Sequence, residues 1–179
     1  METLETERLL LRQFRDSDTD EYAELCADEE VMRYVGGRAL NRAEAWRQMA
    51  MLAGHWQLRG YGFWAVEEKR TGALVGRVGC WRPEGWLDFE IGWTLARQFW
   101  GRGYATEAAR ASMDYAFTRL GREHVVSIIH PDNVRSIRLA ERLGERREGD
   151  WEVQGIKVVV YGITREEWER QVGSRKAEG

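Results

Sequence analysis

Glycines at positions 101 and 103 mark the part of the chain best suited to bind a phosphate. The extended apolar segment 89–95 precedes them, and a helical run rich in alanine begins near Ala105. A strand that turns through glycines into a helix directs several free backbone N–H groups at one point, and the positive end of the helix dipole adds to their effect. Because glycine has no Cβ, a phosphate can approach the main chain closely. The turn therefore predicts a phosphorylated ligand.

Three classes of phosphorylated ligand use turns of this kind, and the neighbouring residues help to separate them. A Walker-type nucleotide loop needs a Lys-Ser or Lys-Thr pair after the glycines, where this chain has Tyr104 and Ala105. A dinucleotide site favours glycine at the position of Thr106, and it is expected in an early strand–helix–strand unit. Coenzyme A is the third class, since its pyrophosphate can occupy the same kind of helix start. A nucleotide oxidoreductase stays open as a rival function.

The composition is that of one globular domain. The 179 residues are 43% hydrophobic and 32% charged, which suffices for one core and not for two comfortable domains. We expect a single domain over 1–179, with a core at about 6–168 and a frayed polar tail at 169–179. The net charge of −3 does not suggest nucleic-acid binding. No apolar run approaches the roughly 20 residues of a membrane helix, and the acidic N-terminus lacks the form of a secretory signal, so we expect a cytoplasmic protein without a membrane partner.

The cysteines and histidines give no reason to expect a metal. Cys26 and Cys80 lie far apart in apolar surroundings, which favours two free buried thiols in a reducing compartment. His55, His124 and His130 show no ligand-like spacing with each other or with the cysteines. Cys80 also has no basic neighbour in sequence to activate it as a nucleophile.

The pattern of apolar residues predicts one α/β domain with a mixed central sheet of about six to seven strands flanked by helices. The strand–helix–strand unit from Phe89 to Ile129 should be parallel, with a right-handed crossover. Asn41 and Asn133 are candidate helix N-caps, and Gly60 and Gly144 end the same two helices. The predicted strands are 9–12, 63–66, 74–80, 86–95, 125–129, 148–153 and 157–163. The predicted helices are 18–26, 29–34, 41–60, 104–120 and 134–143.

Several motifs, taken together, resemble the GCN5-related N-acetyltransferases. Gln98-x-x-Gly101-x-Gly103 matches the Gln/Arg-x-x-Gly-x-Gly/Ala motif of that family. Other strings are similar to the branch that acetylates ribosomal-protein N-termini, and the resemblance runs from about residue 6 to 168 in the expected order. These strings are 6–12, 90–93, 99–108, and Asn133-x-x-Ser136 followed by Leu143-Gly144.

The resemblance implies that acetyl coenzyme A is the co-substrate. The family separates its fourth and fifth strands, here 86–95 and 125–129, and holds the pantetheine arm between them. The pyrophosphate would take amides from 101–106. Arg102 can equally be a solvated surface arginine, and Asn133 can serve as a helix cap, as a cofactor contact or as both. The expected cofactor-binding residues are Trp93, Thr94, Leu95, Gln98, Gly101, Arg102, Gly103, Tyr104, Ala105, Thr106 and Asn133.

The resemblance also implies direct transfer of an acetyl group from the thioester to a primary amine. Glu90, in a run of apolar residues, is the expected base, although it can also be an exposed position on an alternating strand. A backbone N–H near 93–95 would stabilise the oxyanion. Ser136 is the expected proton donor to the departing thiolate, with Tyr161 second. Many members use a tyrosine for this step, and the helix 134–143 contains none.

The acceptor amine is the least defined partner. Residues 18–59 and the last hairpin are expected to form its groove, and the candidates are peptide α-amines, antibiotic amines and polyamines. A non-catalytic acyl-coenzyme-A-binding or sensor module is the alternative function. An edge strand in the final hairpin could also pair with a second copy, giving a homodimer. Tryptophans that could line the groove, or equally belong to the core, are Trp46, Trp56, Trp64 and Trp151.

Overall fold

Side chains that point alternately to the two faces of one central strand explain why helices cover both faces of the sheet. In β3 (Phe63–Glu68), Trp64 and Val66 point into the core cluster that contains helix α4 (Tyr104–Thr118). Phe63 and Ala65 point the other way, into the cluster formed with helices α1 (Thr19–Ala27), α2 (Glu29–Met32) and α3 (Arg42–Arg59). Since successive side chains of a strand face opposite sides, one buried strand holds two helical layers together.

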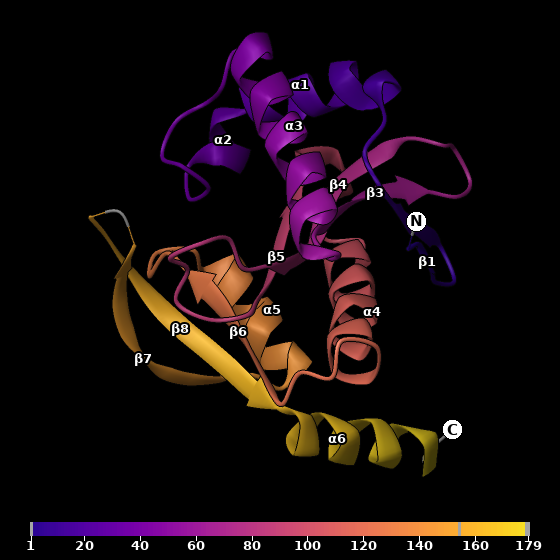
Figure 1. The fold of residues 1–179 in the computed structure, drawn as a ribbon, viewed down its shortest axis with the longest axis vertical. Coiled ribbons are helices and arrows are strands. Elements are labelled where there is room, and N and C mark those ends of the chain that lie inside the picture. Colours follow the sequence, from indigo (N-terminus) through magenta and orange to yellow (C-terminus); the bar gives the residue numbers. More distant parts are fainter. Residues whose placement is uncertain (1, 154, 178–179) are drawn as a thin grey trace.

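The computed structural model describes residues 2–153 and 155–177. These residues form one mixed eight-stranded sheet in the order β1-β2-β3-β4-β5-β6-β8-β7, with β7 at one edge. Figure 1 shows α1, α2 and α3 together at one end of the molecule and α6 (Arg165–Ala177) at the other. The remaining elements are β1 (Leu4–Glu5), β2 (Leu9–Arg12), β4 (Leu74–Trp81), β5 (Glu90–Leu95), β6 (His124–Ile129), α5 (Val134–Leu143), β7 (Arg146–Val153), β8 (Ile156–Thr164) and the short 3-10 turns Asp16–Asp18 and Arg97–Phe99.

The sheet is divided between β5 and β6. These two strands are parallel and share one paired position, Glu90 opposite Val126. The Val126 N–H donates to the Phe89 carbonyl at 2.9 Å. By contrast, β5 pairs with β4 along its whole length, from Glu90 to Leu95. The gap expected between the fourth and fifth predicted strands is therefore confirmed, and it widens towards the C-terminal end of β5.

The main differences from the sequence prediction concern an added first strand, the start of β5 and the end of the chain. The count of strands rises to eight because Leu4–Glu5 pairs with β2 as a two-residue edge strand, too short to produce an alternating pattern. The strand predicted from Trp86 begins at Glu90, since the Trp86 N–H closes a turn onto the Pro83 carbonyl at 3.2 Å. The chain beyond Trp168, where a frayed tail was expected, continues in α6, because Trp168 is buried and Val172 packs against the core one turn later.

Other local predictions are confirmed. Asn41 caps α3 in a reciprocal arrangement with Glu44, and Gly60 ends that helix in the left-handed conformation. Cys26 and Cys80 are both free and buried. Among the helices of the described residues, none is long and apolar enough to cross a membrane.

Candidate functional site

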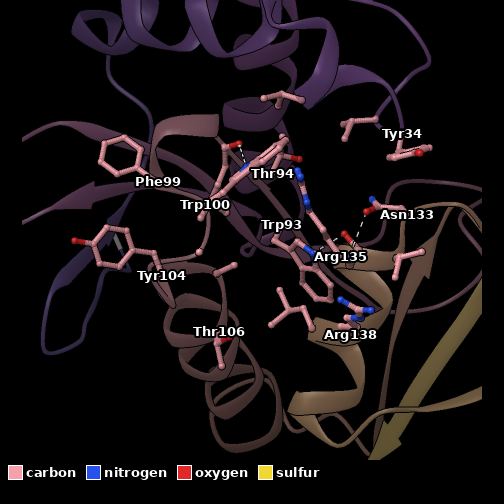
Figure 2. A pocket seen from close by; sticks show the side chains of 18 of the residues that line it. Tyr34, Trp93, Thr94, Phe99, Trp100, Tyr104, Thr106, Asn133, Arg135 and Arg138 are labelled. Atoms are coloured by element: carbon pink, nitrogen blue, oxygen red, sulfur yellow. Dashed lines mark hydrogen bonds between the residues drawn. The ribbon is translucent and has the colours of Figure 1, made fainter.

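A cavity of about 910 Å³ opens where β5 has separated from β6. Its walls are the C-terminal half of β5, the N-terminal turn of α4, one face of α5 from Val134 to Arg142, and the segment 30–35 in and after α2. Figure 2 shows Trp93 and Thr94 of β5, Tyr104 and Thr106 of α4, and Asn133 of the turn before α5 around this space. The division of the sheet therefore opens this cavity, and the glycine turn lies at its rim.

The N-terminus of α4 offers unpaired amides to the cavity. The first amides of a helix, here those of Tyr104, Ala105 and Thr106, have no acceptor within the helix. The N-cap residue is Gly103, which has no side chain to cap them. Gly101 and Gly103 have φ of +74° and +80°, and a Cβ placed on Gly101 would meet nothing within 4 Å. The turn is thus open in front of a positive helix end, as an anion site requires.

The start of α5 is different, because a side chain already occupies it. Asn133 is its N-cap, and the Asn133 Oδ1 accepts from the Ser136 N–H at 3.2 Å. The predicted cap is therefore confirmed. Asn133 and Ser136 also line the cavity, so capping leaves both side chains within reach of a ligand.

The main chain of β5 presents unpaired groups along the gap. The Ala96 N–H donates to β4 residue Val75, and the Phe89 carbonyl accepts from β6. Because main-chain groups alternate between the two neighbours of a strand, Trp93 and Leu95 face the gap and Thr94 faces β4, opposite Arg77. The N–H and carbonyl of Trp93 and the N–H of Leu95 can therefore hold an extended ligand by its amides, while the Leu95 carbonyl already accepts from the Trp100 indole. Thr94 is also a lining residue, but its backbone belongs to the β4 ladder.

Trp93 connects the two sides of the gap. Its indole Nε1 donates to the Ser136 Oγ at 3.1 Å, and its ring packs against the small cluster that contains Ile137 and Tyr161. The two candidate proton donors, Ser136 and Tyr161, thus lie near the same tryptophan. Ser136 lines the cavity, whereas Tyr161 is buried behind it and is not among the lining residues.

Two predicted cofactor residues lie outside the cavity, and a third, Tyr104, lines it but directs its hydroxyl elsewhere. Gln98 is exposed and lines a separate hollow beside α1. The Arg102 side chain is exposed and folds over the Phe99 ring at 5.5 Å, outside the cavity. Tyr104 lines the cavity with its base, but its hydroxyl donates to the buried Glu68 and points away from Asn133 (Figure 2). The hydrogen bond to Glu68 raises the pKa of Tyr104.

Sequence reasoning missed the cationic wall of the cavity. Arg135, Arg138 and Arg142 of α5 line it, and their spacing of three and four residues places them on one helix face. That spacing was available in the sequence as a signal. The Arg135 guanidinium also lies 4.3 Å from the centre of the Trp100 ring, whose indole donates to the Leu95 carbonyl at 2.9 Å. Further polar or charged lining residues that the prediction did not include are Glu30, Arg33, Tyr34 and Asp132.

Glu90 is buried at the closed end of the gap, 9% exposed. The prediction that it could be an exposed position is wrong. Its Oε2 accepts from the Trp86 indole at 2.7 Å. Burial raises the pKa of Glu90 to about 7, against the opposing influence of Trp86 and of the Arg77 guanidinium. A carboxyl tuned to neutral pH can accept or give up a proton, although Glu90 is not itself a lining residue of the cavity.

The tryptophans proposed for the acceptor groove are not at the cavity. Trp56 and Trp64 belong to the main core, where they make an edge-to-face contact at 5.1 Å. Trp46 and Trp151 are about half exposed, at 49% and 53%. None of these four residues lines the cavity, while Trp93 and Trp100 do.

Taken together, the arrangement fits an elongated thioester with a charged nucleotide end. Amides of α4 and arginines of α5, at the open end of the gap, suit phosphates. Unpaired main-chain groups along β5 suit a pantetheine arm. Glu90, a carboxyl of raised pKa, lies at the closed end of the gap.

Residues 8–146 match the family model described as the acetyltransferase (GNAT) domain, and the chain belongs to that family. The chain is 38% identical over 150 residues to the uncharacterized protein YkkB of Bacillus subtilis, covering 79% of this chain and 83% of that protein. It is 30% identical to an Aspergillus fumigatus protein named FsC-acetyl coenzyme A-N(2)-transacetylase, covering 94% and 78%. A solved acetyltransferase from Agrobacterium tumefaciens superposes with a TM-score of 0.83 at 30% identity, covering 92% and 95%.

Proposed function

We propose that this protein transfers an acetyl group directly from acetyl coenzyme A to the nitrogen of a primary amine. One observation carries the proposal: a cavity joins the uncapped N-terminus of α4 to the unpaired edge of β5. The family supports acetyl coenzyme A as co-substrate. The name of the Aspergillus fumigatus relative also describes acetyl transfer from that thioester to nitrogen.

Each group of residues then has one task in binding. Amides of Gly101 to Thr106 hold the pyrophosphate, together with the arginines of α5. The N–H and carbonyl of Trp93 and the N–H of Leu95 hold the pantetheine arm, and an N–H of this segment stabilises negative charge on the carbonyl oxygen of the thioester. Asn133 caps the start of α5 with one lone pair of its Oδ1, and the other lone pair is left for the ligand. When bound, the thioester supplies the activated acetyl group.

Two protons must move during the transfer. Glu90 accepts the proton of the amine, directly or through water, because its raised pKa makes it a usable base near neutral pH. Ser136 gives a proton or a hydrogen bond to the departing thiolate, since it lines the cavity and its Oγ is fixed by the Trp93 indole. Tyr161 is the second candidate for that step.

The pKa of the amine itself favours one class of acceptor. A free α-amine has a pKa near 8, and a lysine side chain has one near 10.4. A base with a pKa of about 7 can therefore deprotonate an α-ammonium at modest cost, and a lysine at a cost larger by more than two pKa units. We propose a peptide N-terminal α-amine or a small amine of similar pKa as the acceptor.

A panel of ligands followed by an acceptor screen tests the function. Acetyl coenzyme A and coenzyme A at about 100 times their dissociation constants should each add roughly 2.7 kcal/mol to the unfolding free energy. NAD and ATP should add much less. Mass spectrometry of peptides and small amines then detects the acetylated product. A stabilising effect of NAD alone would contradict the proposal and favour a nucleotide oxidoreductase.

The alternative is a module that binds acyl coenzyme A without catalysis. The position of Glu90 outside the cavity lining favours it, because a base must reach the amine. Acetyl coenzyme A would then stabilise the protein, while no amine in the screen would be acetylated faster than in buffer. That result would exclude the catalytic proposal and retain the binding one.

A further inference from the structure

Glu145 is a buried carboxyl that the proposed reaction does not use. It directly follows Gly144, the C-cap of α5, and it is 3% exposed. Its Oε1 lies 2.9 Å from the Ser127 Oγ, and its Oε2 has no hydrogen-bond partner in the described part of the chain. An ionised carboxylate with one hydrogen bond in such surroundings would carry a large desolvation cost.

The number of protons available at Ser127 shows whether the Glu145 carboxyl is neutral or ionised. The Ser127 Oγ lies 2.9 Å from the Ile91 carbonyl and 2.9 Å from the Glu145 carboxyl. A hydroxyl has one proton to donate, and a backbone carbonyl can only accept. Both contacts are full hydrogen bonds when the Glu145 carboxyl carries a proton and donates it to Ser127, whose own proton then goes to Ile91. Burial raises the pKa of Glu145 well above its ordinary value, in agreement with this count.

This chain of hydrogen bonds lies at the point where the sheet divides. Ile91 and Ser127 each follow a member of the last paired position between β5 and β6, Glu90 and Val126. In a continued ladder the Ile91 carbonyl would accept an amide of β6. The Ser127 hydroxyl takes that place, so a side chain spans the start of the gap.

Charged and titratable groups surround Glu145 on several strands. Glu90 of β5 and Glu148 of β7 both oppose its ionisation. Glu148 in turn lies 2.7 Å from the Nε2 of His124, whose Nδ1 is 3.2 Å from Asp88. On β8, Tyr161 lies opposite Ser127. A negative charge on Glu145 would therefore face two further carboxyl groups.

We propose that Glu145 is a positioning residue: held as a neutral acid, it fixes through Ser127 the separation of β5 and β6 beside Glu90. The neutral carboxyl serves as a hydrogen-bond donor rather than as a charge. Glu90 is one residue before Ile91. It keeps its place relative to the cavity because the Ser127 hydroxyl holds the Ile91 carbonyl.

Carbon-13 NMR titration of the glutamate carboxyl carbons tests the neutral state directly. Glu145→Gln assigns the buried signal, and Glu152→Gln, which changes an exposed position of β7, assigns a reference signal. We expect the Glu145 carbon to have the shift of a protonated acid at pH 7. An ionised Glu145 at pH 7 would overturn the proposal.

Thermal unfolding gives a second measure of the same state. A carboxyl whose pKa is higher in the folded than in the unfolded protein lowers stability as pH rises above the unfolded value of about 4.3. The melting temperature of the parent should therefore fall between pH 5 and pH 8 relative to that of Glu145→Gln, and Glu152→Gln should follow the parent. Parallel curves for the parent and Glu145→Gln would contradict a neutral Glu145.

Acetyl transfer tests the positioning role, and this test rests on the proposed function. Glu145→Ala and Ser127→Ala should lower kcat by about tenfold or more, because a displaced catalytic group loses rate steeply, and should leave the Kd of acetyl coenzyme A within about twofold. Glu145→Gln should recover most of kcat, since its amide N–H can donate to Ser127, and the acid limb of the pH–rate profile should stay in place. Two results would refute the positioning role, because each would mean that the negative charge of Glu145 matters. One is a loss of kcat in Glu145→Gln equal to that in Glu145→Ala, and the other is a shifted acid limb. A parent protein that acetylates no amine would refute the proposed function and leave the NMR result unaffected.

Discussion

The two ends of the gap between β5 and β6 use opposite chemistry. The open end is built from backbone amides of α4 and from arginines of α5 that are largely exposed, such as Arg138 and Arg142. The closed end contains two buried carboxyls, Glu90 and Glu145, each with a raised pKa. Binding a phosphate tolerates water, because several donors share the charge. Adjusting a carboxyl to neutral pH requires that water be excluded. One division in the sheet thus separates anion binding from proton transfer.

Removal of the Glu90 carboxylate should have the largest effect and should act only on the closed end. We expect Glu90→Gln to lower kcat by roughly 10²-fold or more, the usual contribution of a general base, while the Kd of acetyl coenzyme A stays unchanged. The parent rate should rise with pH through about 7, as Glu90 loses its proton, and the variant should lose this rise. Steady-state kinetics and calorimetry measure both quantities, with Glu152→Gln as the control. A higher Kd for acetyl coenzyme A together with an unchanged kcat would mean that Glu90 serves binding, and would reverse the roles assigned to the two ends.

A methyl group in the glycine turn should affect only the open end. Gly101→Ala should weaken acetyl coenzyme A binding by about tenfold, because the new Cβ enters the space that a phosphate needs. Gly60→Ala is a matched control: both glycines have φ of +74° and no atom within 4 Å of the added Cβ, and Gly60 lies at the end of α3. Each variant should lose roughly 1–2 kcal/mol of stability from the left-handed backbone. Equal affinity of the two variants for acetyl coenzyme A would mean that the phosphate does not bind at this turn.

Ser136 and Tyr161 lie between the two ends, and comparison of their variants assigns the proton donor. Ser136→Ala should lower kcat by about tenfold, because it removes the hydroxyl that faces the cavity. This loss is smaller than the roughly 10²-fold or more of a full acid–base group. Tyr161→Phe should change kcat less, since that hydroxyl lies behind Trp93. Single-turnover measurements of product formation separate this step from product release. The reverse order of effects would make Tyr161 the donor.

The arginines of α5 should contribute least individually. Arg138→Gln and Arg142→Gln should each weaken coenzyme A binding by about two- to fivefold at low salt, the range expected for exposed charge pairs. The difference from the parent should shrink as salt rises, because exposed charges are screened. Arg47→Gln, an exposed position of α3, is the control. Titrations at two ionic strengths measure the effect, and a salt-independent loss would indicate a packing role.

At the open end, the sequence predicted the glycine turn and the cap of α5 because local patterns define them, and it missed the arginines of α5. Gly101 and Gly103 before a helix, and Asn133 before Val134, are short-range signals whose physical meaning does not depend on the rest of the fold. The closed end depends on tertiary burial. Glu145, in the polar run after Gly144, has the sequence context of a surface residue, and only the packing of α5 and β6 places it in the interior. The Leu4–Glu5 strand and α6 also depend on contacts with distant segments.

The single paired position between β5 and β6 has a mechanical consequence. Five strands on one side and three on the other are each joined internally by longer antiparallel ladders. The two blocks can therefore pivot about Glu90 and Val126 without breaking those ladders. Such a pivot would stretch the hydrogen bond from Ser127 to the Ile91 carbonyl, so the Glu145 carboxyl that holds Ser127 also limits how far the two blocks can swing apart.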